Sequence, residues 1–445
     1  MARHRIGNYS FQWTDTHLPR EETDPLRFDY DELGSKAVKK LQQMAREKSR
    51  GAAADASYCL GAFDMYAALR DHHAEDETLD QLWREAHTVP DWVDWTQIER
   101  GQKFFYRYAP ANLMGFALQG FVGENSAASG VVEVLVRTGG FSTRVLLRRL
   151  LETLQLVLQV TESLESIQPG GRGHATALRV RLLHSAVRER ILRLAEARPD
   201  YFDVGRFGVP VNTLDCIHSV ATFCCNHMWL QLPRMGVYPS EQETADYIAV
   251  FRYVGYLLAT PDTYFASVAR AKATMESMLV HELRITETSR VVGHNFVECV
   301  RDLPPLNMSA GFIEAGSRAL NGDELCDSLG LGRAGLLAHA CWRGHCWFVR
   351  GLALAQRRIP GVDDVVVKYF RRVLGEAVRK SLGGASKMEF RHVPRLGKLT
   401  KREANARITS SSSSSSSAAE ASLLFLSWPL RRPVEAFYFA VCSGI

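Results

Sequence analysis

A regular spacing of apolar residues, three or four positions apart, runs through most of this 445-residue chain and constrains its fold more than any other feature. The pattern begins at Ser35 and continues to about residue 394, with few clusters of β-branched residues. Apolar side chains at this spacing line one face of an α-helix, whereas a half-buried strand alternates apolar and polar residues. Because no convincing alternating run and no internal repeat occur, we predict an all-α fold.

Breaks rich in glycine and proline divide this region into long helices. Gly139-Gly140 and Pro169-Gly170-Gly171 bound a predicted helix at 141–167. A second predicted helix, at 174–197, follows the Pro169-Gly170-Gly171 break. Further helices are predicted at 37–45, 52–69, 213–232, 240–259, 263–279, 314–320, 335–357 and 362–382. We therefore expect three parts: an extended polar arm at 1–34, a single large domain at 35–394, and a tail at 395–445.

The tail differs in composition from the rest of the chain. It contains eight consecutive serines, Ser410 to Ser417, which cannot bury enough apolar surface to offset the entropy of ordering. We expect it to be disordered. The stretch 386–407 holds seven basic and two acidic residues and so accounts for the whole net charge of +5. Since the remaining body has no excess charge, we expect no nucleic-acid partner.

Cysteine usage and the N-terminus indicate where the protein works. Nine cysteines without a regular spacing predict reduced, buried thiols. The N-terminus has no apolar core typical of a secretory signal, and no window reaches about 18 uncharged apolar residues. We expect a cytoplasmic protein or one peripherally associated with an internal membrane, and the basic run of the tail is one candidate for that contact.

The predicted helix at 174–197 carries the most informative residue, His184. It lies within an apolar stripe formed by Val180, Leu183, Val187, Ile191 and Leu194. An imidazole directed into an apolar interior is either a core histidine satisfied by two hydrogen bonds or a ligand of a metal or of haem iron. Arginines on the neighbouring faces would suit haem propionates, although they also fit a solvated face: Arg179, Arg181, Arg188 and Arg190.

The preceding predicted helix carries a second polar group. Arg149, Glu152 and Thr153 are three and four positions apart and therefore share one face. Most of the remaining circumference is apolar, so these groups need partners in the interior. Two interpretations stay open at this point: a local Arg149–Glu152 ion pair on an exposed strip, or a polar cap over a cofactor.

A third cluster has enough potential ligands for zinc: Cys216, His218, Cys224, Cys225 and His227. Its spacing lacks the paired ligands of a structural zinc site, and buried cysteines used as small apolar residues are the alternative. The sequence contains no phosphate-binding glycine loop, no serine-hydrolase elbow and no zinc-protease motif.

Five segments together match a known family: 89–108, 137–155, 169–188, 208–215 and 324–333. The most specific part is R-V-R-x-x-H-x-x-V-R at 179–188, followed by N-x-x-D at 212–215. Over roughly residues 12–395 the chain resembles the fungal branch of the latex clearing protein, or rubber oxygenase, family. That branch includes the endoplasmic-reticulum-bound oxygenase of mycophenolic acid biosynthesis.

The resemblance implies a globin-like helical core enlarged by additional helices, with b-type haem as the cofactor. It implies that dioxygen cleaves a carbon–carbon double bond of a hydrophobic isoprenoid or prenylated small molecule. By resemblance, His184 is the proximal iron ligand and Glu133 a catalytic carboxylate. The other positions it indicates are Arg149 and Thr153 as distal polar residues, His218 near the haem, and Asp215 as a supporting structural residue; Arg179 and Arg188 would then serve the propionates.

One position departs from the family pattern. Bacterial members carry lysine just before the distal threonine, where this chain has Glu152. We therefore expect no lysine-capped iron, and polyisoprene is not the expected substrate. The alternative to an oxygenase is a catalytically silent helical protein of the same fold that binds haem or a prenyl lipid. A zinc-dependent hydrolase built on the cysteine–histidine cluster is a third hypothesis.

Overall fold

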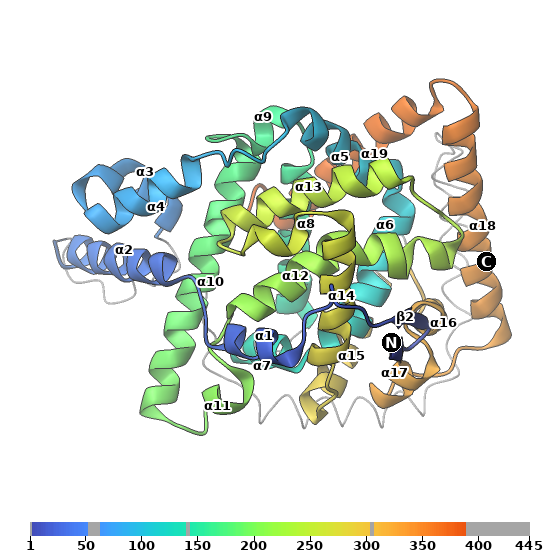
Figure 1. Cartoon of the computed structure of the whole chain (residues 1–445), viewed down its shortest axis with the longest axis horizontal. Coiled ribbons are helices and arrows are strands. Elements are labelled where there is room, and N and C mark those ends of the chain that lie inside the picture. The colour runs from blue at the N-terminus through green and yellow to red at the C-terminus, as the bar shows by residue number, and fades with distance from the viewer. Residues whose placement is uncertain (1, 52–62, 139–142, 303–306, 389–445) are drawn as a thin grey trace.

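The computed structural model describes residues 2–51, 63–138, 143–302 and 307–388 (Figure 1). This part of the chain is mostly helical, with one small two-stranded sheet, which confirms the predicted all-α class. The first helices are α1 (Arg20–Thr23), η1 (Pro25–Arg27), α2 (Glu32–Gly51), α3 (Met65–His72), η3 (His73–Glu75), α4 (Glu77–His87), α5 (Trp95–Arg107), α6 (Ala109–Gly115), η4 (Phe116–Asn125), α7 (Ser129–Arg137), α8 (Thr143–Val160), α9 (Leu164–Ile167) and α10 (Arg172–Ala197).

The second half of the chain continues in the same way. Its helices are α11 (Val204–Phe207), α12 (Thr213–Asn226), η5 (His227–Gln231), η6 (Pro233–Met235), α13 (Glu241–Leu257), η7 (Asp262–Phe265), α14 (Val268–Glu282), α15 (Glu287–Val300), α16 (Ala310–Asn321), α17 (Asp323–Ser328), α18 (Leu336–Arg358) and α19 (Val362–Leu382). Two of these segments, η4 and η5, are π-helical. The tail predicted at 395–445 lies outside the described residues.

Helix α10 contributes side chains to two hydrophobic cores, and in Figure 1 it lies between helices α2, α3 and α4 and the rest of the fold. One side of α10, including Leu178 and Leu182, packs against α2, α3 and α4, which lie beyond it at the left of the view. Val180 belongs to the larger core on the other side. Further along the helix, Val187 packs with Val134 of α7 in a small cluster. The helix that carries His184 is therefore held from both sides.

The N-terminal arm is not simply extended. Strands β1 (Arg3–Ile6) and β2 (Tyr9–Gln12) form an antiparallel hairpin that the sequence pattern did not predict, because four residues are too few to display alternation. The hairpin is attached to distant helices: the Asn8 amide donates to two carbonyls near the end of α16, and the Tyr9 hydroxyl donates to Glu276 of α14 at 2.6 Å. The arm is thus part of the folded body.

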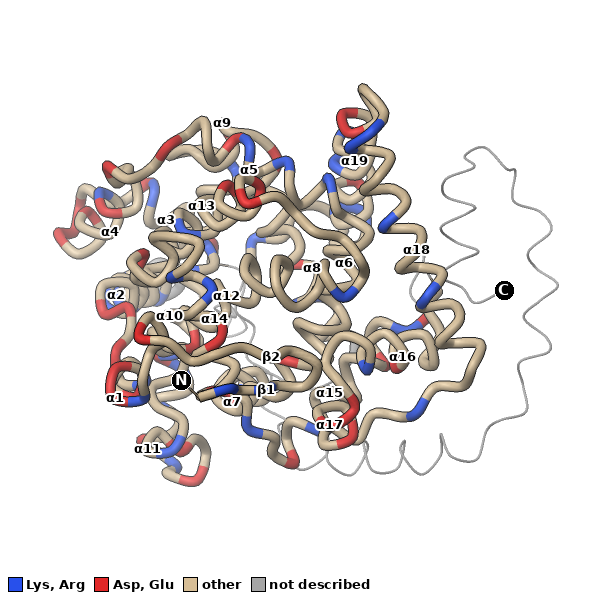
Figure 2. Tube along the Cα trace, turned by 45° about the vertical axis from the view of Figure 1, so that its right-hand side comes forward, with Lys and Arg blue, Asp and Glu red and all other residues tan. Residues whose placement is uncertain are grey.

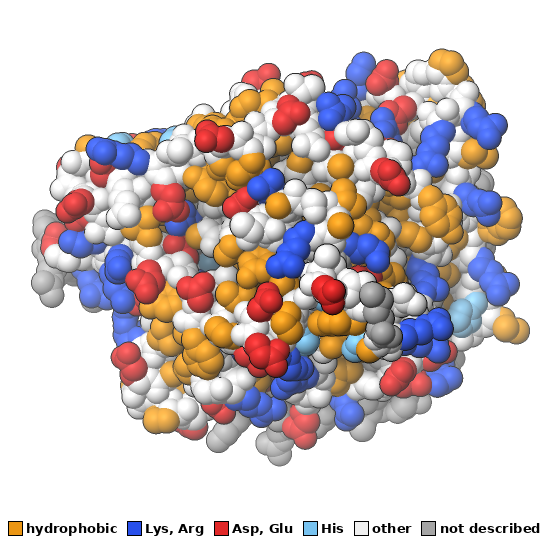
Figure 3. Space-filling view, in the orientation of Figure 1, with side chains coloured by type: hydrophobic (Ala, Val, Ile, Leu, Met, Phe, Trp, Pro, Cys, Tyr) orange, Lys and Arg blue, Asp and Glu red, His pale blue; other side chains and the backbone are white. Residues whose placement is uncertain are grey.

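Helix α18 runs along one edge of the molecule, at the right in Figure 1, and is unusually exposed. Its exposed apolar side chains are Leu336, Leu337, Trp347 and Leu354, of which Leu336 is 91% exposed and Trp347 71%. Its charged residues are four arginines with no acidic residue, and basic positions mark it in Figure 2. Figure 3 shows apolar and basic side chains interleaved along this edge.

Within the described ranges, no helix has both the length and the apolar content needed to span a bilayer.

Candidate functional site

Helices α8 and α10 approach each other closely where α10 begins. A Cβ atom on Gly173 would lie 2.6 Å from the Gln159 carbonyl oxygen, so only glycine fits there. Ser166 bridges the helices, since its hydroxyl donates to that carbonyl at 2.7 Å and accepts from the Gly173 amide at 3.1 Å. The Thr176 hydroxyl donates to the Gln159 side chain at 2.5 Å. These contacts fix α8 against the helix that carries His184.

His184 lies in the middle of α10, four residues after Val180 and three before Val187. Its side chain keeps a partly exposed surface, and neither ring nitrogen has a hydrogen bond to any residue in the described ranges. The ring is otherwise surrounded by protein: burial lowers the pKa of His184 to about 4, and the positive charge of Arg188 acts in the same direction. The imidazole is therefore neutral near pH 7 and retains a lone pair with which it can bind a metal ion.

Two other buried histidines provide a contrast. The Nε2 atom of His174 lies 2.8 Å from the Ala86 carbonyl oxygen, as in a satisfied core histidine. His227 has no hydrogen-bond partner for either nitrogen in the described chain, but its ring has no exposed surface. Aromatic rings enclose it with centroids 5.2–6.5 Å away: Phe104, Phe105, Phe116 and Tyr247. Among these three, only His184 combines an unpartnered nitrogen with accessible surface.

Helix α8 supplies an apolar wall and two polar side chains. Its leucines are buried or partly buried in the large core: Leu146, Leu147, Leu150, Leu151 and Leu154. Arg149 donates to the carbonyls of Thr138 at 2.7 Å and Leu135 at 3.3 Å, at the C-terminal end of α7. Burial lowers the pKa of Arg149. Thr153, one turn later, is partly exposed, and its hydroxyl has no hydrogen bond within the described chain.

Glu133 lies buried on α7 and forms an ion pair with Arg137, one turn later. That pair uses Oε2 of the carboxylate, and Oε1 accepts no hydrogen bond from the part of the chain that the structure describes. The neighbouring Val134 packs with Val187 of α10, so α7 runs alongside the part of α10 next to His184. Helices α7, α8 and α10 therefore bring Glu133, Arg149 and His184 to one region of the fold.

The two arginines predicted to serve the propionates are engaged by protein groups. Arg179 forms an ion pair with Asp64, with nitrogen–oxygen distances of 2.5 and 3.1 Å. Arg188 is buried and donates to the carbonyls of Pro210 at 3.2 Å and Val211 at 2.7 Å. Neither guanidinium is free in this structure, and their role toward a cofactor remains a prediction.

The Arg149–Glu152 ion pair considered in the sequence analysis does not form. Glu152 instead accepts from Arg148 at 3.1 Å and from the Ser386 hydroxyl at 2.6 Å. The reason is geometric, since the Arg149 guanidinium is directed to the carbonyls at the end of α7. The glutamate that stands where bacterial relatives carry lysine thus attaches α8 to the segment that follows α19.

His218 belongs to a buried polar network centred on Glu124. Its Nε2 atom lies 2.7 Å from Glu124 Oε1, to which the Thr222 hydroxyl also donates at 2.9 Å. The amides of Asn226 and Gln119 donate to Glu124 Oε2 at 2.6 and 2.8 Å. Burial opposes charge on both partners, yet the pair raises the pKa of His218 and lowers that of Glu124. In this structure the His218 ring is committed to a protein carboxylate.

Glu124 was not among the residues predicted from the sequence, although the sequence holds a signal for it. His218, Thr222 and Asn226 recur every four residues and so share one face of α12. Gln119 and Glu124 are five residues apart in η4, the spacing that a π-helix brings into register. A lone glutamate after an apolar, glycine-rich run needs such partners.

Asn212 and Asp215, the second half of the family motif, begin α12. The Asn212 side chain caps the helix by accepting from the Asp215 backbone amide at 2.9 Å. Burial and, to a smaller extent, the charge of Glu282 together raise the pKa of the Asp215 carboxyl to about 7.

The zinc hypothesis gains no support from the geometry. Cys224 donates to the Val220 carbonyl at 3.1 Å, and its sulfur lies 3.4 Å from that of Cys225. His218 is bound to Glu124 and His227 is enclosed by aromatic rings. Among the residues described, no three His, Cys, Asp or Glu side chains are placed to hold a metal ion.

Comparisons with known proteins show the family and the fold of the chain. The family model described as "ER-bound oxygenase mpaB/B'/Rubber oxygenase, catalytic domain" matches residues 98–351, more than half of the chain. The fold is similar to that of latex clearing protein in its closed state, with a TM-score of 0.57 and 17% identity over 78% of this chain and 91% of that one. None of the curated proteins matches the sequence. The chain therefore belongs to the family of ER-bound oxygenase mpaB and rubber oxygenase catalytic domains.

Proposed function

We propose that the protein is a haem b-dependent oxygenase that cleaves a carbon–carbon double bond of a hydrophobic isoprenoid or prenylated molecule with dioxygen, giving two carbonyl products. The observation that carries this proposal is His184: a neutral imidazole without a hydrogen-bond partner in the described chain, partly accessible, on a helix fixed from both sides. A proximal haem ligand needs a neutral imidazole with one ring nitrogen that the iron can reach.

The residues present fit a haem group. His184 would hold the iron through its free lone pair, and the haem would supply the site at which dioxygen is activated. Leu146 and Leu150 of α8 would exclude water from that site and give a prenyl chain an apolar surface. Thr153 offers a hydroxyl that is not committed elsewhere in the described chain.

Two charged residues would complete the chemistry. Arg149 is a partly buried cation held at the end of α7, and it would stabilise negative charge that develops on oxygen atoms nearby. Glu133 would accept a proton at Oε1 from an allylic carbon of the substrate. Arg137 would hold that carboxylate in place through its contact with Oε2.

The first test is the visible spectrum of the protein reconstituted with haem. We expect a Soret band for the wild type and for His339→Ala, an exposed histidine on α18 used as the control. His184→Ala should lose the band or shift it strongly. A wild type without a Soret band, or a His184→Ala variant with the wild-type spectrum, would contradict the proposal.

Oxygen consumption with a farnesylated or terpenoid substrate separates the oxygenase from a silent member of the fold. Glu133→Gln should retain the Soret band, while its rate of oxygen consumption should fall about 10²–10⁴-fold, the usual contribution of a general base. A haem-loaded wild type that consumes no oxygen with any prenylated substrate would favour the silent alternative.

We also propose a peripheral contact with a membrane through α18. A helix with exposed leucine and tryptophan side chains, arginines and no acidic residue has the composition of helices that lie in the lipid interface. Such a contact would bring a poorly soluble prenylated substrate to the protein from the lipid phase.

A further inference from the structure

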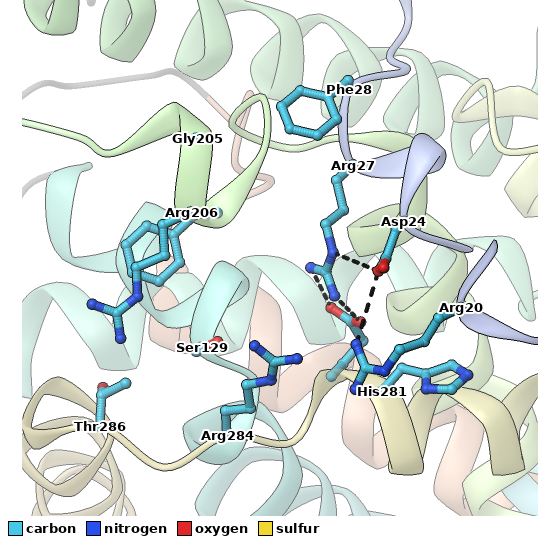
Figure 4. Close-up of a pocket in the computed structure, with 12 residues that line it drawn as sticks. Arg20, Asp24, Arg27, Phe28, Ser129, Gly205, Arg206, His281, Arg284 and Thr286 are labelled. Atoms are coloured by element: carbon cyan, nitrogen blue, oxygen red, sulfur yellow. Dashed lines mark hydrogen bonds and ion pairs between the residues drawn. The ribbon is translucent and has the colours of Figure 1, made fainter. Parts of the chain in front are cut away.

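A basic pocket lies at the junction of five segments that are far apart in the sequence (Figure 4). Its volume is about 320 Å³. Segments from α1 and η1, the start of α7, helix α11, the end of α14 and the connection to α15 all contribute to its walls. None of the residues to which we assign a role at the proposed haem site lines this pocket.

The two carboxylates of the pocket are already neutralised. Arg27 forms a two-pronged ion pair with Glu282, with distances of 2.9 and 2.5 Å. Asp24 lies 3.5 Å from Arg27 and 3.9 Å from Arg20. Burial lowers the pKa of His281, so this histidine adds no positive charge at neutral pH. The arginines of this side of the pocket thus balance its acidic residues.

Arg206 and Arg284 are the arginines of the pocket that have no acidic partner among the described residues. Neither guanidinium has a hydrogen bond or an ion pair within the described ranges, and in Figure 4 no dashed line reaches either. The Arg284 side chain extends toward the space between Ser129 and Arg27 (Figure 4). Arg206 stands on the opposite side of the pocket from Arg20, with its guanidinium 5.0 Å from the centroid of the Phe207 ring. The pocket therefore has two positive charges without a carboxylate partner.

A second cavity offers a comparison within the same molecule. The cavity of about 510 Å³ beside α5 and α13 is also lined by arginines. There Arg100 is paired with Asp246, and Arg107 with Glu243 and Asp363. The unpaired guanidiniums thus distinguish the first pocket from the second.

We propose that the pocket lined by Arg206 and Arg284 binds the phosphate group of a small molecule. Guanidinium groups match phosphate in geometry, and a doubly charged phosphate would balance the two unpaired arginines. The uncapped start of α7 at Ser129 adds the positive end of a helix dipole. Phe28 and Phe207 give the wall an apolar part that suits the organic portion of a phosphate ester.

Titration calorimetry tests this directly, with inorganic phosphate and phenyl phosphate as probes at constant ionic strength. Above about pH 8, where both probes carry close to two negative charges, we expect both to bind. Arg206→Gln and Arg284→Gln should each weaken binding at least about tenfold, the loss expected for one charge-assisted contact. Both arginines are exposed, so the variants should fold normally, which circular dichroism checks.

The matched control is Arg343→Gln, which removes the same charge from an exposed arginine on α18 and should leave binding unchanged. Equal affinities for the two probes would assign the pocket to free phosphate, and tighter binding of phenyl phosphate would assign it to an ester. The inference is overturned if neither probe binds better than chloride, or if the double arginine variant binds as the wild type does. The measurement needs no haem and no activity, so its outcome is independent of the proposed function.

Discussion

His184 and His227 have the same side chain and opposite surroundings. Both rings are neutral near pH 7, because burial lowers the pKa of His184 to about 4 and that of His227 to about 3. His184 keeps an accessible surface, whereas His227 has none. In the sequence both stand within apolar runs, so the local pattern alone did not separate them. The neighbouring helices decide which imidazole a ligand can reach.

The isolation of His227 predicts how an apolar replacement will behave. Its folded-state pKa of about 3 lies below the ordinary value near 6.5, so as the pH falls below about 6.5 the unfolded chain takes up a proton that the folded protein refuses. Wild-type stability should therefore fall by about 1.4 kcal/mol per pH unit from this residue. His227→Met removes the penalty and should gain about 2 kcal/mol over the wild type between pH 7 and pH 5.

Urea unfolding at the two pH values measures this difference. The exposed His339→Met serves as the control and should follow the wild-type profile. Parallel profiles for His227→Met and the wild type would show that His227 does not contribute to the acid sensitivity.

The polar network around Glu124 could not be predicted from the sequence. His218 was identified from the family motif, and its environment follows from the structure: a carboxylate contributed by a π-helix nearly a hundred residues earlier. Charged residues near an apolar run can be recognised in a sequence. Which of them meet depends on how η4 and α12 pack, and helical periodicity does not determine that.

Long helices with glycine-rich boundaries were predicted well from the sequence. The prediction at 174–197 corresponds to α10 at Arg172–Ala197, and that at 362–382 corresponds to α19. The prediction at 141–167 was too long, because the chain leaves the helix after Val160 and resumes at Leu164. Several helices were missed, among them α4, α5 and α15. In α15, polar residues interrupt the apolar positions, so the helical spacing is hard to recognise.

The contact between α8 and α10 leads to a second prediction. Gly173→Ala would place a Cβ atom 2.6 Å from the Gln159 carbonyl oxygen and 3.0 Å from that of Ser166, and backbone atoms cannot easily move away. We expect a loss of about 1–3 kcal/mol in the free energy of unfolding, as for other overpacked sites. Haem affinity should fall as well, since α8 and α10 both form the proposed site.

Gly375→Ala in α19 is the matched control. Nothing lies within 4 Å of a Cβ atom at that position, so the change should be neutral or stabilise the helix by up to about 1 kcal/mol. Chemical denaturation and a haem titration on both variants provide the measurements. Equal stabilities for the two variants would show that the helices can separate without cost.

For the whole molecule, the exposed face of α18 predicts binding to anionic membranes. Vesicles that contain phosphatidylserine should retain the protein in a sedimentation assay, and phosphatidylcholine vesicles should retain it less. Replacing Trp347 and Leu354 together by serine should weaken binding at least about tenfold, because two apolar side chains no longer enter the interface. Added salt should weaken it further.

A control at another exposed apolar residue tests whether the effect is specific to α18. Phe28→Ser removes a side chain that is 54% exposed in the N-terminal segment and should leave vesicle binding unchanged. Equal binding of all three proteins would show that α18 does not contact the lipid.

The position of α10 between two cores has a consequence for variants far from the site. Helices α2, α3 and α4 pack against Leu178 and Leu182 of α10, the helix that carries His184. Substitutions that weaken the packing of α2, α3 and α4 would leave the imidazole chemically intact but would hold it in position less firmly. Such substitutions, although far from the proposed haem, would change how long the protein retains the haem. Screens for activity should therefore find variants well outside the proposed haem site.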